Sequence, residues 1–307
     1  MRLPQFISPS ALSLWQSNKE EYYLRYLAEN PPPRMLQTQA MSIGSSFDAY
    51  VKSYMFERLF GKGSDPQFEL DTIFETQVEE QNRDWAREAG AHVFDCYKKL
   101  GALADLLTEL ESASGTPRFE FTVSGTIGDV PLLGKPDVWY VTKDAVEIIL
   151  DFKVNGYCSD YPTYPKRGYV KLRPDGTEHK KAHISKVKGV KINIAEFMES
   201  IDSSWAQQLA TYAWLCGTPV GEFFIVAIDQ LVCNGSSIKV AEHRSQISPD
   251  FQQKILNEYQ GLWATIRSGH IFRDRSYEES KARCDILDLQ YAAYTDGNDF
   301  IRELTNR

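Results

Sequence analysis

Two aspartates and a lysine carry the clearest chemical signal in this chain. Asp137 closes the stretch Gly134-Lys135-Pro136-Asp137, and Asp151-Phe152-Lys153 follows after thirteen intervening residues. The segments 130–141 and 146–154 are rich in β-branched and aromatic residues, and the polar pair Lys143-Asp144 lies between them. This pattern predicts a β-hairpin that brings both aspartates and the lysine together.

Alternation along the second strand places Asp151 and Lys153 on one face, with Cα atoms roughly 6–7 Å apart, and turns Phe152 toward the core. Hard carboxylate oxygens suit Mg²⁺ or Mn²⁺. Lys153 can orient or deprotonate an attacking water whose pKa the metal lowers. The alternative is a surface hairpin whose aspartates and lysine are only solvated charge.

Helices are expected around this hairpin. Ser8-Pro9 predicts an N-cap and first helical residue, and Ser276-x-x-Glu279 a capping box before a last helix to about Tyr294. Further helices are expected over 8–27, 42–60, 71–99, 100–112, 205–216 (capped by Ser203 or Ser204) and 249–269, and strands over 118–123 and 221–228. The order predicts an α/β (α+β) fold with a mixed β-sheet core flanked by helices.

Composition narrows the class of protein. The chain has 307 residues, of which 42% are hydrophobic, and a formal net charge of −8. No stretch reaches the roughly 18 apolar residues of a membrane span, and no apolar run typical of a secretory signal follows Met1. The five cysteines are scattered and never form a Cys-x-x-Cys pair, which favours reduced thiols and a cytoplasmic protein.

One segment departs from the acidic average. Residues 156–191 hold nine basic and three acidic residues, a net charge of +6, together with four tyrosines. Basic residues interleaved with aromatic ones favour a surface for phosphates and bases. The other reading is a solvated loop. The candidate DNA-binding residues are Lys166, Arg167, Lys171, Arg173, Lys180, Lys181, Lys186 and Lys188.

Taken together, these motifs resemble the PD-(D/E)XK nuclease superfamily in its RecB-like, phage exonuclease branch. Pro136-Asp137 and Asp151-x-Lys153 match the namesake signature. The other matches, in chain order, are Ser8-Pro9-Ser10-x-Leu12 with Trp15 and Tyr22-Tyr23, Gly44-Ser45-Ser46-Phe47-Asp48, Glu120 one strand before Asp137, and Gln208-x-x-x-Tyr212. The likeness spans about residues 8–230 and implies a restriction-endonuclease-like fold with N- and C-terminal helical additions.

The chain departs from the branch in two places. Asp48 stands where the branch has a metal-binding histidine, so its role is either an oxygen ligand or a solvent-facing helix residue. The four cysteines that hold an iron–sulfur cluster in some members are absent from the pattern, so no cluster is expected.

The resemblance implies roles for single residues. Asp137, Asp151 and the backbone carbonyl of Phe152 would bind one or two Mg²⁺ or Mn²⁺ ions, with Asp48 as a further ligand. Lys153 would position the water. Glu120 would support the metal site or be structural, and Gln208 and Tyr212 would position a DNA phosphate or simply pack their helix. Ser10 could bind DNA, whereas helix capping suffices to explain Ser8.

The implied activity is metal-dependent hydrolysis of a DNA phosphodiester that leaves a 5′-phosphate and a 3′-hydroxyl. An exonuclease on DNA ends or single strands is favoured, in phage-type recombination, repair or degradation, with a recombinase or helicase as a conceivable partner. The alternatives are a structure-specific endonuclease and a catalytically weak DNA-binding module. We expect one nuclease domain over 1–307, divided into a helical part (1–115), a catalytic core (116–245, with the basic insertion 156–191) and C-terminal helices (246–307).

Overall fold

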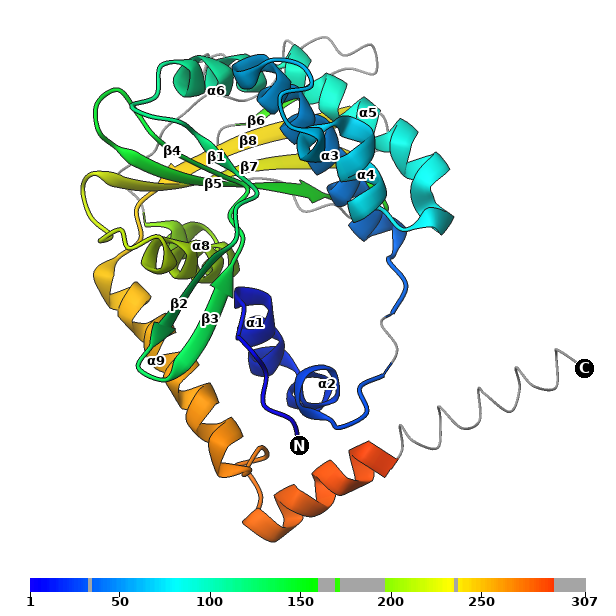
Figure 1. The fold of residues 1–307 in the computed structure, drawn as a ribbon, viewed down its shortest axis with the longest axis vertical. Coiled ribbons are helices and arrows are strands. Elements are labelled where there is room, and N and C mark those ends of the chain that lie inside the picture. Colours follow the sequence, from blue (N-terminus) through cyan, green and yellow to red (C-terminus); the bar gives the residue numbers. More distant parts are fainter. Residues whose placement is uncertain (33–34, 160–168, 172–196, 235–236, 290–307) are drawn as a thin grey trace, which may run out of the picture.

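The computed structural model describes residues 1–32, 35–159, 169–171, 197–234 and 237–289. Its centre is a six-stranded mixed sheet with the strand order β1-β4-β5-β7-β8-β6 (Figure 1). β5 and β7 pair in parallel, and the other neighbours in the sheet are antiparallel. The strands are β1 (Arg118–Phe119), β4 (Val138–Val141), β5 (Glu147–Asn155), β6 (Tyr169–Lys171), β7 (Phe224–Asn234) and β8 (Ser237–Ser245).

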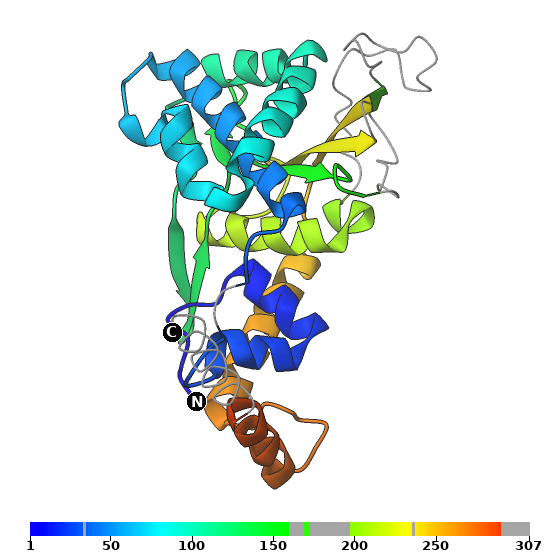
Figure 2. The same ribbon diagram turned by 90° about the vertical axis from the view of Figure 1, so that its right-hand side faces the viewer.

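Helices cover both faces of this sheet, which confirms the predicted fold class. α3 (Gln39–Phe60), α5 (Arg83–Lys99) and α6 (Ala102–Glu111) pack on one face, and α8 (Ser203–Leu215) packs on the other (Figures 1 and 2). Because both faces are covered, the centre of β5 is apolar at consecutive positions, and Ile148, Ile149 and Leu150 are all buried. Phe152 packs under α3 against Phe47 and Tyr97, as predicted.

A hydrophobic cluster outside the main sheet packs the N-terminal helices against the C-terminal helices of the described chain. The hairpin of β2 (Val123–Ile127) and β3 (Val130–Gly134) leaves the main sheet and packs its Val130 and Leu132 beside α1 (Pro9–Ser17) and α9 (Pro249–Ser268) (Figure 1). The capping box is confirmed, since Ser276 and Glu279 exchange hydrogen bonds at the start of a helix over 277–289. The remaining elements are α2 (Lys19–Tyr22), η1 (Tyr23–Leu27), η2 (Pro66–Phe68), α4 (Leu70–Gln77), η3 (Glu80–Asn82) and α7 (Met198–Ile201).

Several expected boundaries were wrong for local reasons. The first helix ends at Ser17, because Asn18 leaves helical geometry and accepts from the Glu21 N–H as the cap of the next one. The expected helix 71–99 breaks after Gln77. The cap of α8 is Asp202 and not Ser203 or Ser204, since Asp202 Oδ1 accepts from the backbone N–H groups of Ser204 and Trp205.

Two strands also differ from expectation. The segment 130–141 is not one strand, because Lys135-Pro136-Asp137 separates β3 from β4 and Pro136 has no N–H to donate to a ladder. The strand expected over 118–123 ends at Phe119. The β2–β3 hairpin, with Gly128 at φ +62° in its turn, and β8 were not predicted.

Candidate active site

The site forms where β5 extends beyond its neighbour β4. Val138, the first residue of β4, pairs with Leu150, so Asp151, Phe152 and Lys153 continue past the end of that strand. The Phe152 N–H donates to Asp137 Oδ2 at 2.9 Å in place of a strand partner. In an extended strand the N–H and C=O of one residue project toward the same edge, so the Phe152 carbonyl faces this side as well.

On the α8 side, the two charged residues of β5 meet a glutamine. Lys153 forms an ion pair with Asp151, which is 4% exposed in its side chain, and donates to Gln208 Oε1 at 3.0 Å. Gln208 Nε2 approaches both Asp151 oxygens at 3.3 and 3.4 Å and the Tyr212 hydroxyl at 2.9 Å. Spacing of four residues on α8 therefore places Gln208 and Tyr212 together on the face toward β5.

On the α3 side, three carboxylates surround a lysine that sequence reasoning missed. Lys52 Nζ donates to Asp48 Oδ2 at 2.6 Å, to Glu120 Oε1 at 2.5 Å and to Asp137 Oδ1 at 3.0 Å. Lys52 has no exposed side-chain surface, whereas the carboxylates are 16–21% exposed. Asp48 is therefore not a solvent-facing helix residue. The spacing of Asp48 and Lys52 by four in a helix was the one sequence signal that pointed to this pair.

Glu120 reaches this cluster through an unusual backbone conformation. Its φ of +47° lies in the left-handed region, which a residue other than glycine adopts at an energetic cost. The Glu120 N–H donates to the Asp137 carbonyl at 3.0 Å, and Lys135 forms an ion pair with the Glu120 carboxylate. The end of β1 thus turns the carboxylate toward Lys52 instead of continuing as a strand.

Burial and neighbouring charges shift the pKa values of the three aspartates in this site strongly. Burial raises the pKa of Asp48 to about 7, although Lys52 opposes the shift. Burial, with the nearby Asp137, also raises the pKa of Asp151 to about 7. At Asp137 burial is outweighed by Lys52, Lys153 and the Phe152 N–H, so its pKa lies below the usual value. Neighbouring groups whose pKa values are driven apart are typical of functional sites.

A cavity of about 340 Å³ opens onto these groups. Residues from α3, β5 and α8 line it, together with Lys135 and Asp137 from the segment between β3 and β4. A second cavity of about 520 Å³ shares Lys135, Lys153, Gln208 and Tyr212 with it and continues toward the start of α1. The lining of the first is Gly44, Ser45, Phe47, Asp48, Gln77, Lys135, Asp137, Asp151, Phe152, Lys153, Val154, Gln208 and Tyr212.

The other predicted residues lie in different places. Ser8 caps α1, where its Oγ accepts from the Ala11 N–H at 3.2 Å, and Ser10 lies exposed beside it, along the second cavity. Lys166, Arg167, Arg173, Lys180, Lys181, Lys186 and Lys188 fall outside the described residues, and Lys171 lies in β6. The role of these residues in DNA binding stays a prediction, as does the single-domain organisation.

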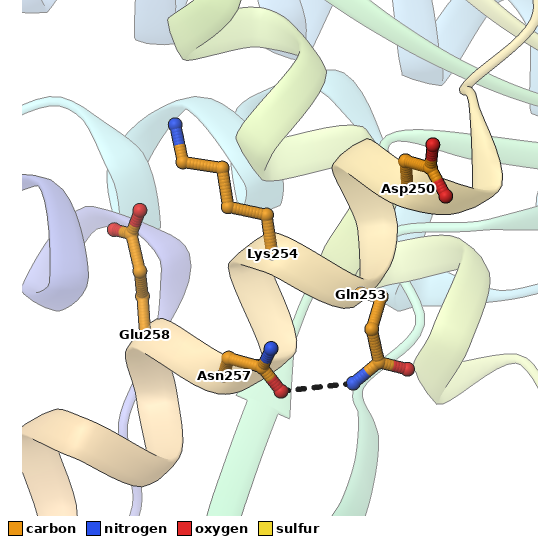
Figure 3. A pocket seen from close by; sticks show the side chains of 5 residues that line it. All are labelled: Asp250, Gln253, Lys254, Asn257 and Glu258. Carbon is orange, nitrogen blue, oxygen red and sulfur yellow. Dashed lines mark hydrogen bonds between the residues drawn. The ribbon is translucent and has the colours of Figure 1, made fainter.

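A hollow along α9 differs from the site in construction. Asp250, Gln253, Lys254, Asn257 and Glu258 line it, all from one helix, and Gln253 Nε2 donates to Asn257 Oδ1 at 2.9 Å (Figure 3). Within the described part of the chain, groups from several elements do not converge there as they do at the end of β5.

No helix among the described residues is both long and apolar enough to span a membrane.

Comparisons with known proteins find similarity only to solved structures, at low sequence identity. No family model matches the sequence, and no curated protein matches it. Among solved structures, the chain is similar to a protein of Eubacterium rectale described as "Putative exonuclease", at 13% identity and a TM-score of 0.40, over 90% of this chain and 82% of that one. It is also similar to a protein described as SSO0001, at 12% identity and a TM-score of 0.27, over 81% of this chain and 82% of the other.

Proposed function

We propose that this protein is a divalent-metal-dependent DNA nuclease that hydrolyses phosphodiester bonds. The observation that carries the proposal is the convergence of Asp137, Asp151 and Lys153 on one cavity at the end of β5, supported by Gln208 and Tyr212 from α8. The same residues carry the sequence resemblance to PD-(D/E)XK nucleases. Two carboxylates beside a lysine in an open cavity are suited to chemistry on a phosphate group.

The donor set fits Mg²⁺ or Mn²⁺. Asp137, Asp151 and the Phe152 carbonyl present hard oxygens at one strand end, and Asp48 faces the same cavity. A divalent ion bound there supplies Lewis-acid activation of the attacking water and of the phosphate. Lys153 is the chain's own contribution. Its side chain is 27% exposed, and its ammonium, held by Asp151 and Gln208, stabilises negative charge that develops on the phosphate.

The surroundings of the site favour a DNA end or a single strand as the substrate. The second cavity extends from Lys153 to Ser10, so a nucleic acid strand could lie along it. It is also lined by Trp205, an aromatic side chain on which a base can stack. Lys135, half-exposed beside Glu120, adds positive charge in a chain of net charge −8. We therefore favour exonuclease action, with a structure-specific endonuclease on the same core as the alternative. A place in phage-type recombination, repair or degradation is part of the proposal.

One observation favours a second candidate function. Lys52 already neutralises part of the acidic cluster, as expected if the cluster were a structural ion-pair network in a catalytically weak DNA-binding module. In such a module the protein would bind DNA without any need for a divalent ion.

A cleavage assay separates these functions. The protein is incubated with linear and closed circular DNA, single- and double-stranded, in Mg²⁺, Mn²⁺ or EDTA. We expect cleavage of linear DNA with either ion and none in EDTA. Cleavage of closed circles as well would select the endonuclease. Binding without cleavage in every buffer would reject the enzyme and select the binding module.

Two variants act as controls. Asp151→Asn removes a proposed metal ligand with little change in volume and should abolish cleavage. Lys254→Ala removes an exposed lysine in the hollow on α9, away from the site, and should leave cleavage unchanged. If both variants retained activity, the assignment of the site to the end of β5 would be wrong.

A further inference from the structure

The buried lysine of α3 occupies a position of the kind that a metal ion takes. Oxygen atoms of Asp48, Glu120 and Asp137 lie within 4.8 Å of one another, a spacing that could hold a cation. The Lys52 ammonium donates to all three at 2.5–3.0 Å. An ammonium has three N–H donors and no acceptor, so three carboxylates satisfy it completely.

The location of Lys52 makes its replacement by an ion difficult. Its side chain is fully buried, and the cavity is lined by Asp48, Asp137 and Asp151 but includes neither Lys52 nor Glu120. Lys52 therefore lies behind the carboxylates as seen from the cavity. The three carboxylates lie at hydrogen-bond distance from the ammonium and supply the paired negative charge that a buried cation requires.

Asp137 joins the two halves of the site. Its Oδ1 accepts from Lys52, and its Oδ2 accepts from the Phe152 N–H on the side of Asp151. An ion that enters from the cavity meets Asp137 and Asp151 on that second side, whereas an ion between Asp48, Glu120 and Asp137 would have to displace Lys52.

We infer that Lys52 is a built-in cation that limits this site to a single divalent ion, bound on the side of Asp137 and Asp151. Lys52 is then a positioning residue, which keeps Asp48, Glu120 and Asp137 assembled before any metal binds. The inference rests on the proposed nuclease site, but it concerns the number of ions and the metal-free fold and not the rate of cleavage.

The first test is the Mn²⁺ stoichiometry of the full chain without DNA, measured by calorimetry and by electron paramagnetic resonance. Wild-type protein should bind one ion at the site, and Asp151→Asn should lose it. Two ions lost together in Asp151→Asn, or no ion in the wild type, would overturn the inference. This measurement needs no variant of Lys52.

The second test uses Lys52→Met, which keeps an unbranched chain one atom shorter than lysine and removes the ammonium group. Three clustered carboxylates then lack their cation, so the melting temperature without metal should fall by roughly 5–10 °C. Mn²⁺ should restore more stability to this variant than to the wild type, with two ions bound. The same stoichiometry and the same response to Mn²⁺ as the wild type would contradict the inference.

Two further variants separate charge from packing. Asp48→Asn combined with Lys52→Met removes one negative charge together with the positive one, and should recover part of the lost melting temperature without metal. Lys135 is the other lysine bound to Glu120, and its side chain is 52% exposed. Lys135→Met should therefore change the melting temperature little. A loss in the double variant as large as in Lys52→Met would indicate a packing role only and overturn the inference.

These measurements can reject the inference without rejecting the proposed function, and the reverse. A protein that binds one Mn²⁺ ion but cuts no DNA would keep the inference and reject the nuclease. A protein that cuts DNA but takes two ions in the wild type would keep the nuclease and reject the inference.

Discussion

Two lysines of the site are held so differently that they must act differently. Lys153 lines both cavities and is 27% exposed, whereas Lys52 is fully buried behind the carboxylates. Lys153 can contact a phosphate in the cavity, and Lys52 can only act through Asp48, Glu120 and Asp137. Removing each lysine should therefore damage different properties of the protein.

Lys153→Ala should lower the cleavage rate by about 10²–10³-fold, because it removes the positively charged hydrogen-bond donor proposed to contact the reacting phosphate. The melting temperature should change by only a few degrees, since the side chain is partly exposed. Initial rates on linear DNA at saturating Mg²⁺ and a thermal melt check both statements. Full activity in Lys153→Ala would remove this residue from the chemistry.

Single residues also mark what the sequence could predict. Asp137, Asp151 and Lys153 were recognisable because alternation along a strand determines which side chains share a face. Lys52 was not, because its partners Glu120 and Asp137 lie 68 and 85 residues away, and a lysine in a helix is ordinarily exposed. Glu120 was placed in a strand that its left-handed backbone does not continue.

At the scale of elements, the site depends on how closely α3 packs against α5. Ser46 Oγ donates to the Ala86 carbonyl at 2.7 Å, and a Cβ at Gly90 would lie 2.0 Å from Ser46 Oγ and 3.1 Å from the Ser46 backbone. Gly90 therefore allows the close approach of the helix that carries Asp48 and Lys52.

Gly90→Ala should push α3 away from α5 and lower the free energy of unfolding by about 1–3 kcal/mol, despite the better helix propensity of alanine. Cleavage should weaken with it, since Asp48 moves. Gly261→Ala is the matched control, because Gly261 lies exposed in α9 with nothing within 4 Å of its added Cβ. That variant should gain about 0.5–1 kcal/mol. Equal changes in both, measured by urea unfolding, would argue against the packing role.

Long elements with clear caps were the most predictable. The cap Ser8, the start of α9 at Pro249 and its end at Gly269 were located correctly, because short polar caps and a left-handed glycine leave a local signal. β8 had no such signal. Its ionisable residues Glu242, His243 and Arg244 are buried by partners distant in sequence, such as Trp205 against His243 and Tyr140 against Arg244, which no local pattern reveals.

At the scale of the whole molecule, the sheet buries a second set of charges away from the site. Asp229 on β7 and Glu242 on β8 are paired neighbours in the ladder, and Arg244 lies on the same strand as Glu242. All three are at most 3% exposed. Asp229 accepts from Tyr97, and Arg244 donates to Tyr140 at 3.3 Å and approaches Glu109 at 3.8 Å.

Both carboxylate oxygens of Glu242 lack a hydrogen-bond partner in the described structure. One arginine cannot balance two buried acids, so one of them stays protonated. Burial, reinforced by Asp229, raises the pKa of Glu242 to about 9. The unfolded chain releases this proton near pH 4.5, and the folded protein does so only near pH 9. Folding stability must therefore decline as pH rises through that window.

Glu242→Gln removes this cost, because the amide never ionises in either state. We expect the variant to be stabilised relative to the wild type by about 1–3 kcal/mol at pH 7, with the difference small at pH 5 and largest at pH 9. Urea unfolding at the three pH values measures it, and Glu57→Gln, at an exposed carboxylate on α3, serves as the control. Parallel pH profiles for Glu242→Gln and the wild type would mean that Glu242 ionises normally in the folded protein, and that a second cation reaches it.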